Sequence, residues 1–157
     1  MSAEERAKAL GLDLTRPVTP LANYVPVVRA GNLVFLSGHV PPAGADGSRP
    51  AGKLGADFDA DQGYQFARSV AVALLASLRA EIRSLDRVRR IVKVLGLVNA
   101  TPDFAQHPRV VNGASDLLVE VFGEAVGKHA RSAMGAGSLP GGVPVEIEMV
   151  VEVEDSG

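Results

Sequence analysis

Hydrophobic and polar positions alternate cleanly in the last part of the chain, the stretch VPVEIEMVVEV. Because successive side chains of a strand point to opposite faces, such alternation predicts a strand with one buried and one polar face. The apolar face is predicted to carry Val143, Val145, Ile147, Met149, Val151 and Val153. The polar face is predicted to carry Glu146, Glu148, Glu152 and Glu154.

Two earlier stretches are apolar at both odd and even positions, which is typical of strands that are buried on both faces. These are IVKVLGLV at 91–98 and LVFLS at 33–37. The second is preceded by YVPVVRA at 24–30, and the Gly31-Asn32 pair between them predicts a tight hairpin turn. Pro26 should place the first strand of this hairpin at an edge of the sheet, because proline cannot donate to a strand ladder. A further strand is expected over 130–137.

The stretches with helical periodicity lie between these strands. From 59 to 82 an apolar residue recurs every four positions, and a second stripe runs from about 110 to 123. A short helix over 2–10 is indicated at the N-terminus, where Ser2 and Glu5 have capping-box spacing and Gly11 can end the helix. The Gly- and Pro-rich segment 41–57 is expected to be a loop.

The predicted order of elements is therefore ββαβαββ, an α+β fold in which two helices cover one face of a mixed sheet. We expect a single domain over 1–157, with an N-terminal helix and extended lead-in at 1–20. Because two helices cannot also cover the second face, the strands that are apolar on both sides need another cover. We predict that a second copy of the chain supplies it, since symmetric self-association is common. The alternative is that the N-terminal helix and the loop at 41–57 cover that face.

Composition narrows the function classes. The 157 residues carry a net charge of −2 and contain no cysteine, so disulfides and thiol chemistry are excluded. Five cations lie at 83–93 without an aromatic residue among them, which indicates a solvated rim rather than a nucleic-acid site. The longest apolar run, at 69–78, is too short to span a bilayer. We expect a cytoplasmic protein with neither a membrane nor a nucleic acid as partner.

Motif searches for metal, phosphate and nucleophile sites find no match. The three histidines have no metal-ligand spacing, and no phosphate-binding or dinucleotide-binding glycine pattern occurs. Ser37-Gly38-His39 places a hydroxyl near a base, but no nucleophile elbow surrounds it. We therefore expect no metal and no organic cofactor.

One arginine stands out in the stretch GKHARSAMGAG. Small neighbours leave the guanidinium of Arg131 uncrowded, and its fork can bind a carboxylate with two parallel hydrogen bonds. If the strands that carry Arg131 and Glu146 pair, the two groups could approach one pocket. The alternative is an exposed salt bridge worth ~0–1 kcal/mol. Asn112 precedes Gly113 in the second helix, and this pair could serve close packing on the sheet or turn an amide toward a ligand.

Several segments together resemble the RidA family, also called YjgF-type and often labelled endoribonuclease L-PSP. They occur in the family's order and cover nearly the whole chain after about residue 20: YVPVVRAGNLVFLSGHVPP, GYQFARSVAVALLASL, VKVLGLVNATPDF, NGASDLLVEVFGE, HARSAMG and LPGGVPVEIE. The resemblance implies a chorismate-mutase-like fold and a homotrimer with ligand clefts between subunits. It also implies hydrolysis of reactive enamines and imines (2-imino acids) to 2-keto acids and ammonia without a cofactor.

The resemblance also implies roles for individual residues. Arg131 corresponds to the family's carboxylate-binding arginine and Glu146 to its water-positioning glutamate. The implied substrate-binding residues are Tyr24, Ser37, Gly38 and Asn112.

Two positions depart from the family's pattern. Ala133 stands where deaminases commonly have Cys, and His129 stands where Pro is common, so both are expected to alter the substrate pocket. This keeps two alternatives open. One is a trimer that binds a small carboxylate metabolite without turning it over, and the other is an endoribonuclease or translation inhibitor.

Overall fold

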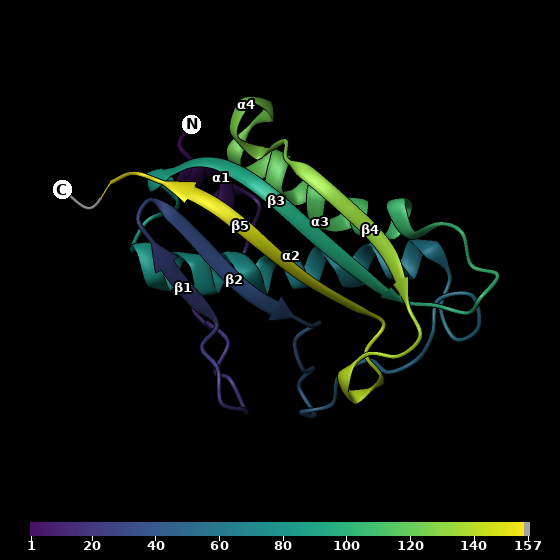
Figure 1. The fold of residues 1–157 in the computed structure, drawn as a ribbon. Helices are drawn as coiled ribbons and strands as arrows, with labels where there is room; N and C mark the ends of the chain where they lie inside the picture. Colours follow the sequence, from purple (N-terminus) through teal and green to yellow (C-terminus); the bar gives the residue numbers. More distant parts are fainter. Residues whose placement is uncertain (156–157) are drawn as a thin grey trace.

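The computed structural model describes residues 1–155, so the expected domain boundary at residue 157 lies outside the described part. Its centre is one five-stranded sheet with the strand order β1-β2-β5-β3-β4 (Figure 1). The strands are β1 (Val27–Ala30), β2 (Leu33–His39), β3 (Val88–Asn99), β4 (Ala130–Ala136) and β5 (Val145–Val153). Only β3 and β4 pair in parallel, and the other neighbours are antiparallel, so the predicted mixed sheet is confirmed.

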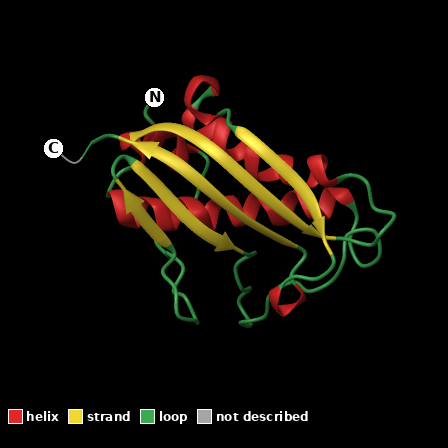
Figure 2. Ribbon diagram, in the orientation of Figure 1, coloured by secondary structure: helices red, strands yellow, loops and turns green. Residues whose placement is uncertain are grey.

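The helices gather on one face of this sheet, as predicted (Figure 2). The two long ones are α2 (Ala60–Ile82) and α3 (His107–Phe122). The shorter ones are α1 (Ala3–Ala9), α4 (Glu124–Gly127) and the 3-10 turns η1 (Leu85–Arg87) and η2 (Pro140–Gly142). Asp59 caps α2 through a reciprocal bond pair with Gln62, which satisfies backbone donors that the first turn leaves free.

The core forms between α2, α3 and the covered face of the sheet. Alternate residues of β5 are buried from Val145 to Val153, which confirms the predicted apolar face of this strand. They lie opposite buried residues of both neighbours, as in the pairs Val34↔Val151 and Val94↔Met149. The two-residue alternation of the sequence thus sets which face of the strand enters the core.

The two long helices approach each other very closely at Gly113. A Cβ built at this position would lie 2.0 Å from the backbone carbonyl oxygen of Tyr64 in α2. Glycine is therefore needed for the crossing of α3 with α2, and its close contact is with that helix rather than with the sheet. Arg68 of α2 pairs with Glu120 of α3 at 2.7 Å beside this crossing.

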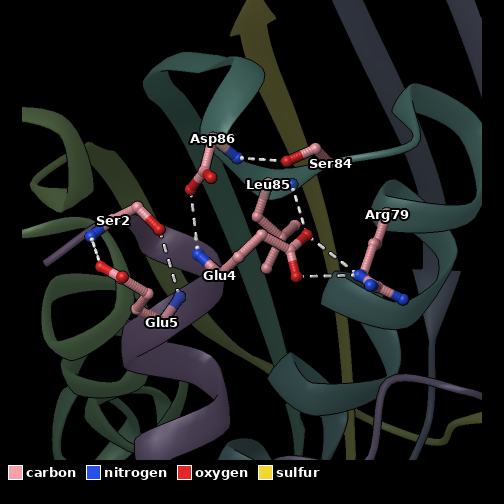
Figure 3. A network of polar contacts seen from close by, with 7 residues as sticks. All are labelled: Ser2, Glu4, Glu5, Arg79, Ser84, Leu85 and Asp86. Carbon is pink, nitrogen blue, oxygen red and sulfur yellow. Dashed lines mark hydrogen bonds and ion pairs between the residues drawn. The ribbon is translucent and has the colours of Figure 1, made fainter.

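A network of polar contacts holds the N-terminal helix α1 against α2 and η1 (Figure 3). The carboxylate of Glu4 accepts from Arg79 Nε at 2.9 Å and from the backbone N–H of Leu85 at 2.8 Å. The backbone N–H of Glu4 in turn donates to Asp86 at 3.0 Å. These bonds hold α1 against the end of α2 and η1, away from the second face of the sheet.

The loop before α2 does not cover the second face either. Leu54 of this loop forms a bridge with Ala100 after β3, and Lys53 Nζ donates to Asn99 Oδ1 at 2.6 Å. The loop thus lies across the ends of the strands. The alternative that α1 and this loop bury the second face is therefore wrong for the single chain.

The second face of the sheet remains open and carries large apolar side chains. Val28 is 52% exposed, Phe35 45% and Met134 48%. Phe35 lies opposite Val28 and Val150 in the ladder, and these residues line a hollow of about 390 Å³ together with Lys93. β2 and β3 carry apolar side chains on both faces, but their predicted burial on both faces is not seen in the single chain, where Phe35 on the open face is exposed. In the described part of the chain, no helix combines the length and apolar character needed to cross a membrane.

Candidate active site

The residues singled out from the sequence form two groups in the structure. We call the first the arginine half-site, and it consists of Asn112, Ser115, His129 and Arg131. We call the second the glutamate half-site, and it consists of Ser37, Gly38, Glu146 and Glu148.

The arginine half-site is built by α3 and the first residues of β4. Arg131 lies opposite the buried residue Val94 in the parallel ladder, so its side chain leaves the sheet on the helix-covered face. There its Nη1 donates to Asn112 Oδ1 at 2.7 Å and to Ser115 Oγ at 3.1 Å. Asn112 thus turns its amide toward the guanidinium, and the guanidinium is half-buried rather than a free surface charge.

His129 closes this half-site from the segment before β4. Its Nδ1 lies 2.7 Å from the carbonyl oxygen of Gly127 and its Nε2 lies 2.9 Å from Ser115 Oγ. Because a carbonyl only accepts, Nδ1 carries the proton and Nε2 accepts from the serine hydroxyl. Burial lowers the pKa of His129, the bond to Gly127 opposes this shift, and the charge of Arg131 lowers the pKa further. Ala133 faces the same side as Arg131 and packs against the core.

The glutamate half-site forms where β2 departs from regular pairing with β5. The ladder shifts register between Leu36 and His39, so Ser37 and Gly38 lie in a bulge. A Cβ at Gly38 would lie 2.9 Å from Glu146 Cδ, so a side chain here would displace the carboxylate from its present position. Glu146 lies on the open face opposite Leu97.

The environment of Glu146 changes its proton affinity. Burial raises the pKa of Glu146 above its ordinary value, and the neighbouring charge of Glu148 raises it further. Both side chains lie on the open face, where Glu148 is exposed and Glu146 is partly buried. Glu146 therefore binds a proton more readily than a carboxylate in water.

The buried histidine His39, which the sequence offered only as a base beside Ser37, supports the bulge. His39 Nδ1–H donates to the carbonyl of Ser37 at 2.7 Å, and Nε2 accepts from Ser77 Oγ in α2 at 2.8 Å. The side chain is 2% exposed, and burial lowers its pKa. The sequence carried no signal for this role, because the predicted strand ended at Ser37 and the bulge shifts the alternation that places His39 on the face of Val34 and Leu36.

The remaining pocket candidates lie beside this bulge. The hydroxyl of Ser37 donates to the carbonyl of Val25 at 2.7 Å, which joins β2 to the segment before β1. Tyr24 lies in that segment with 49% of its surface exposed. Its substrate contact remains a prediction.

The two half-sites lie on opposite faces of the sheet. The strands that carry Arg131 and Glu146 do not pair, because β3 lies between β4 and β5, so the condition for a shared pocket within one chain is not met. Arg131 leaves β4 on the helix-covered face, whereas Glu146 leaves β5 on the open face. One chain therefore does not bring the two groups into a shared pocket. Among residues 1–155, no group of three or more His, Asp or Glu side chains is placed to hold a metal ion.

Comparison with known proteins shows the family to which this chain belongs. Residues 4–146 match the family model described as "YjgF/chorismate_mutase-like, putative endoribonuclease". The chain belongs to the YjgF/RidA family. The resemblance predicted from the sequence motifs is thereby confirmed, and so is the chorismate-mutase-like fold.

Three relatives show how far the likeness extends. Protein TCP17 of Trypanosoma cruzi is 40% identical over 93% of this chain and 91% of its own length. The structure of Atu1372 from Agrobacterium tumefaciens, a protein of unknown function, is 37% identical, with a TM-score of 0.85 over 97% of this chain and 92% of that one. TdcF of E. coli, solved with bound serine, shares the fold at 21% identity, with a TM-score of 0.64 over 90% of this chain and 96% of that one.

Proposed function

We propose that this chain hydrolyses 2-imino acids and their enamine tautomers to 2-keto acids and ammonia, in pockets between the subunits of a homotrimer. The observation that carries the proposal is the pair of half-sites on opposite faces of one sheet. A pocket that needs both Arg131 and Glu146 is completed when the glutamate half-site of one subunit lies against the arginine half-site of the next.

The open face of the sheet supports the assembly. Phe35, Val28 and Met134 are each about half exposed, which leaves apolar surface that a second copy would bury. Glu146 and Gly38 lie on the same face as Phe35, so a neighbouring subunit seated there also reaches the glutamate half-site. The serine bound to TdcF is a small ligand with a carboxylate, which is the group that a guanidinium would hold.

The proposed chemistry uses only groups of this chain and water. A 2-imino acid has a planar carboxylate next to an electrophilic C=N carbon, and Arg131 would hold the carboxylate. Glu146 would orient a water molecule and accept its proton as the oxygen adds to that carbon. Glu146 then returns this proton to the nitrogen, which gives a carbinolamine. The hydroxyl proton of the carbinolamine moves to the same nitrogen as the C–N bond breaks, so that ammonia leaves and the C=O bond of a 2-keto acid forms. The raised pKa of Glu146 suits a group that both accepts and returns a proton.

The first experiment generates 2-imino acids in place with an amino-acid oxidase and follows their decay. The wild type should accelerate the decay, and Arg131→Ala should abolish the acceleration through weaker binding, by roughly 2–5 kcal/mol if the ion pair is buried. If the wild type does not accelerate decay but binds a 2-keto acid saturably, the protein is a carboxylate-binding trimer. The small Ala133 in place of the family's common Cys favours this second candidate.

A mixing experiment tests the position of the pocket between subunits. Arg131→Ala and Glu146→Ala are each expected to be inactive, but co-expressed subunits should regain activity. About one quarter of the interfaces in random trimers combine an intact arginine with an intact glutamate. A mixture that stays as inactive as the separate variants would contradict a shared pocket.

RNA cleavage that survives Arg131→Ala in nuclease-free protein would instead indicate the endoribonuclease alternative.

A further inference from the structure

We propose that Ser115 and His129 are positioning residues that determine which edge of the Arg131 guanidinium receives the substrate carboxylate. This inference deepens the proposed function and rests on it for the identity of the ligand. It is carried by four hydrogen bonds that lie in one chain of contacts, from Asn112 through Arg131 and Ser115 to His129.

The first step concerns the hydrogen atoms of Arg131. Nη1 has two, and its two acceptors are Asn112 Oδ1 at 2.7 Å and Ser115 Oγ at 3.1 Å. Within residues 1–155, no protein group accepts from Nη2 or Nε. The donors left for a ligand are therefore those of the Nε–Nη2 edge, which can bind a carboxylate with two parallel hydrogen bonds. The Nη1–Nη2 edge is blocked, because the protein already occupies Nη1.

The second step concerns the direction of the serine hydroxyl. The carbonyl of Gly127 requires a proton on His129 Nδ1, which leaves Nε2 as an acceptor. Ser115 has one hydrogen and donates it to Nε2, so both of its lone pairs stay available to Arg131. Without the imidazole, this hydroxyl could rotate and donate elsewhere, and its hold on Nη1 would weaken.

The third step concerns the role of His129 itself. Both ring nitrogens are engaged within the chain, by Gly127 and by Ser115. His129 therefore has no free polar atom for a substrate while this arrangement lasts. Its contribution reaches the ligand through Ser115 and the guanidinium, and we assign it to support of Arg131 rather than to direct substrate binding.

The test compares five full-length proteins: the wild type, His129→Leu, Ser115→Ala, His129→Gln and the double variant His129→Leu/Ser115→Ala. His129→Leu keeps the volume but removes the acceptor, Ser115→Ala removes the hydroxyl, and His129→Gln keeps an acceptor for Ser115. The first readout is ¹⁵N NMR of the Arg131 side chain without ligand, with Arg131→Ala used to assign the signals. In the wild type and His129→Gln, separate Nη1 and Nη2 signals should report slow rotation of the guanidinium about its Nε–Cζ bond. In His129→Leu and Ser115→Ala, the two signals should merge.

The second readout is function. His129→Leu and Ser115→Ala should weaken pyruvate binding and raise KM for the imino acid about three- to tenfold, the value of one lost hydrogen bond, while kcat changes less than twofold. His129→Gln should stay within about twofold of the wild type in both constants, and the double variant should be no worse than Ser115→Ala. Thermal unfolding checks that each variant is folded.

Two results would overturn the inference. The first is separate, wild-type-like Nη signals in both His129→Leu and Ser115→Ala. The second is a fall in kcat at constant KM, which would give His129 a direct part in the reaction. If the wild type neither binds pyruvate nor hydrolyses imino acids, the proposed function fails, while the NMR comparison still decides whether Ser115 and His129 hold the guanidinium.

Discussion

The arginine half-site and the glutamate half-site are supported in the same way. In each, a histidine donates from Nδ1 to the carbonyl two residues earlier and accepts a serine hydroxyl from a long helix on Nε2. His129 does this with Gly127 and Ser115 of α3. His39 does it with Ser37 and Ser77 of α2.

What the two histidines support differs. The histidine and serine of the arginine half-site lead to a side chain, so the guanidinium is held directly by hydrogen bonds. His39 instead holds the backbone of the bulge at Ser37. The position of the Glu146 carboxylate is restrained by its contact with Gly38. Among the described residues, no group donates a hydrogen bond to Glu146. The comparison indicates a rigid half that binds and a second half whose carboxylate remains free to direct water.

The largest effect is expected from Glu146→Gln. An amide cannot take a proton from water, so kcat should fall by about 10²–10⁴-fold while Kd for pyruvate stays within about threefold. Wild-type kcat should also decline as pH falls through the raised pKa of Glu146, because the carboxylate becomes protonated there. Steady-state kinetics across pH checks both points. Equal losses in binding and in kcat would contradict the division of labour between the half-sites.

The next effect is expected from Gly113→Ala, which affects only the arginine half-site. The added Cβ would lie 2.0 Å from the Tyr64 carbonyl oxygen, so α3 must move away from α2. Overpacking of about 1–3 kcal/mol should outweigh the gain of about 1 kcal/mol in helix propensity. Urea unfolding should show a net loss of stability, and KM should rise because Asn112 and Ser115 move with α3. Gly137→Ala, with open space around it, is the control.

A smaller effect is expected from Gly38→Ala, which affects only the glutamate half-site. The new Cβ would lie 2.9 Å from Glu146 Cδ, and the flexible end of this side chain can turn aside. Stability should therefore change by less than about 1 kcal/mol, whereas kcat should fall about tenfold because the carboxylate loses its position. Stopped assays of imine decay beside thermal unfolding measure the two quantities. An unchanged kcat would show that the place of Glu146 is not set by this contact.

The smallest effect concerns the pH dependence of stability through His39. Its pKa is lowered by burial, so below the ordinary value of 6.5 the unfolded chain binds more protons than the folded one. Stability should therefore fall as pH drops from 6.5 toward the folded pKa, by at most about 1.4 kcal/mol per pH unit and per group. His129 acts with the same sign, and the raised pKa of Glu146 acts with the opposite sign at lower pH.

The matched variant for this prediction is His39→Gln, in which the amide does not titrate in this range. Urea unfolding at several pH values between 5 and 8 should give a shallower slope for the variant than for the wild type. Identical slopes would mean that His39 is not held neutral in the folded protein.

Local patterns in the sequence determined much of the fold. The periodicities predicted α2, α3 and the alternating faces of β5, and the Gly31-Asn32 pair predicted the hairpin. Capping residues set the starts of α1 and α2. These features depend on neighbours within a few positions along the chain, where side-chain chemistry and backbone geometry are directly linked.

Only the tertiary structure decided how the functional residues relate to one another. β3 separates β4 from β5, and the register of the two ladders places Arg131 and Glu146 on opposite faces of the sheet. The partners of His39 and His129 likewise lie on helices, Ser77 being 38 positions and Ser115 being 14 positions away along the chain. Strand order and helix packing depend on burial between residues that are far apart in the sequence, which local periodicity does not encode. The sequence therefore identified the reactive groups, and only the packed fold determined where they point.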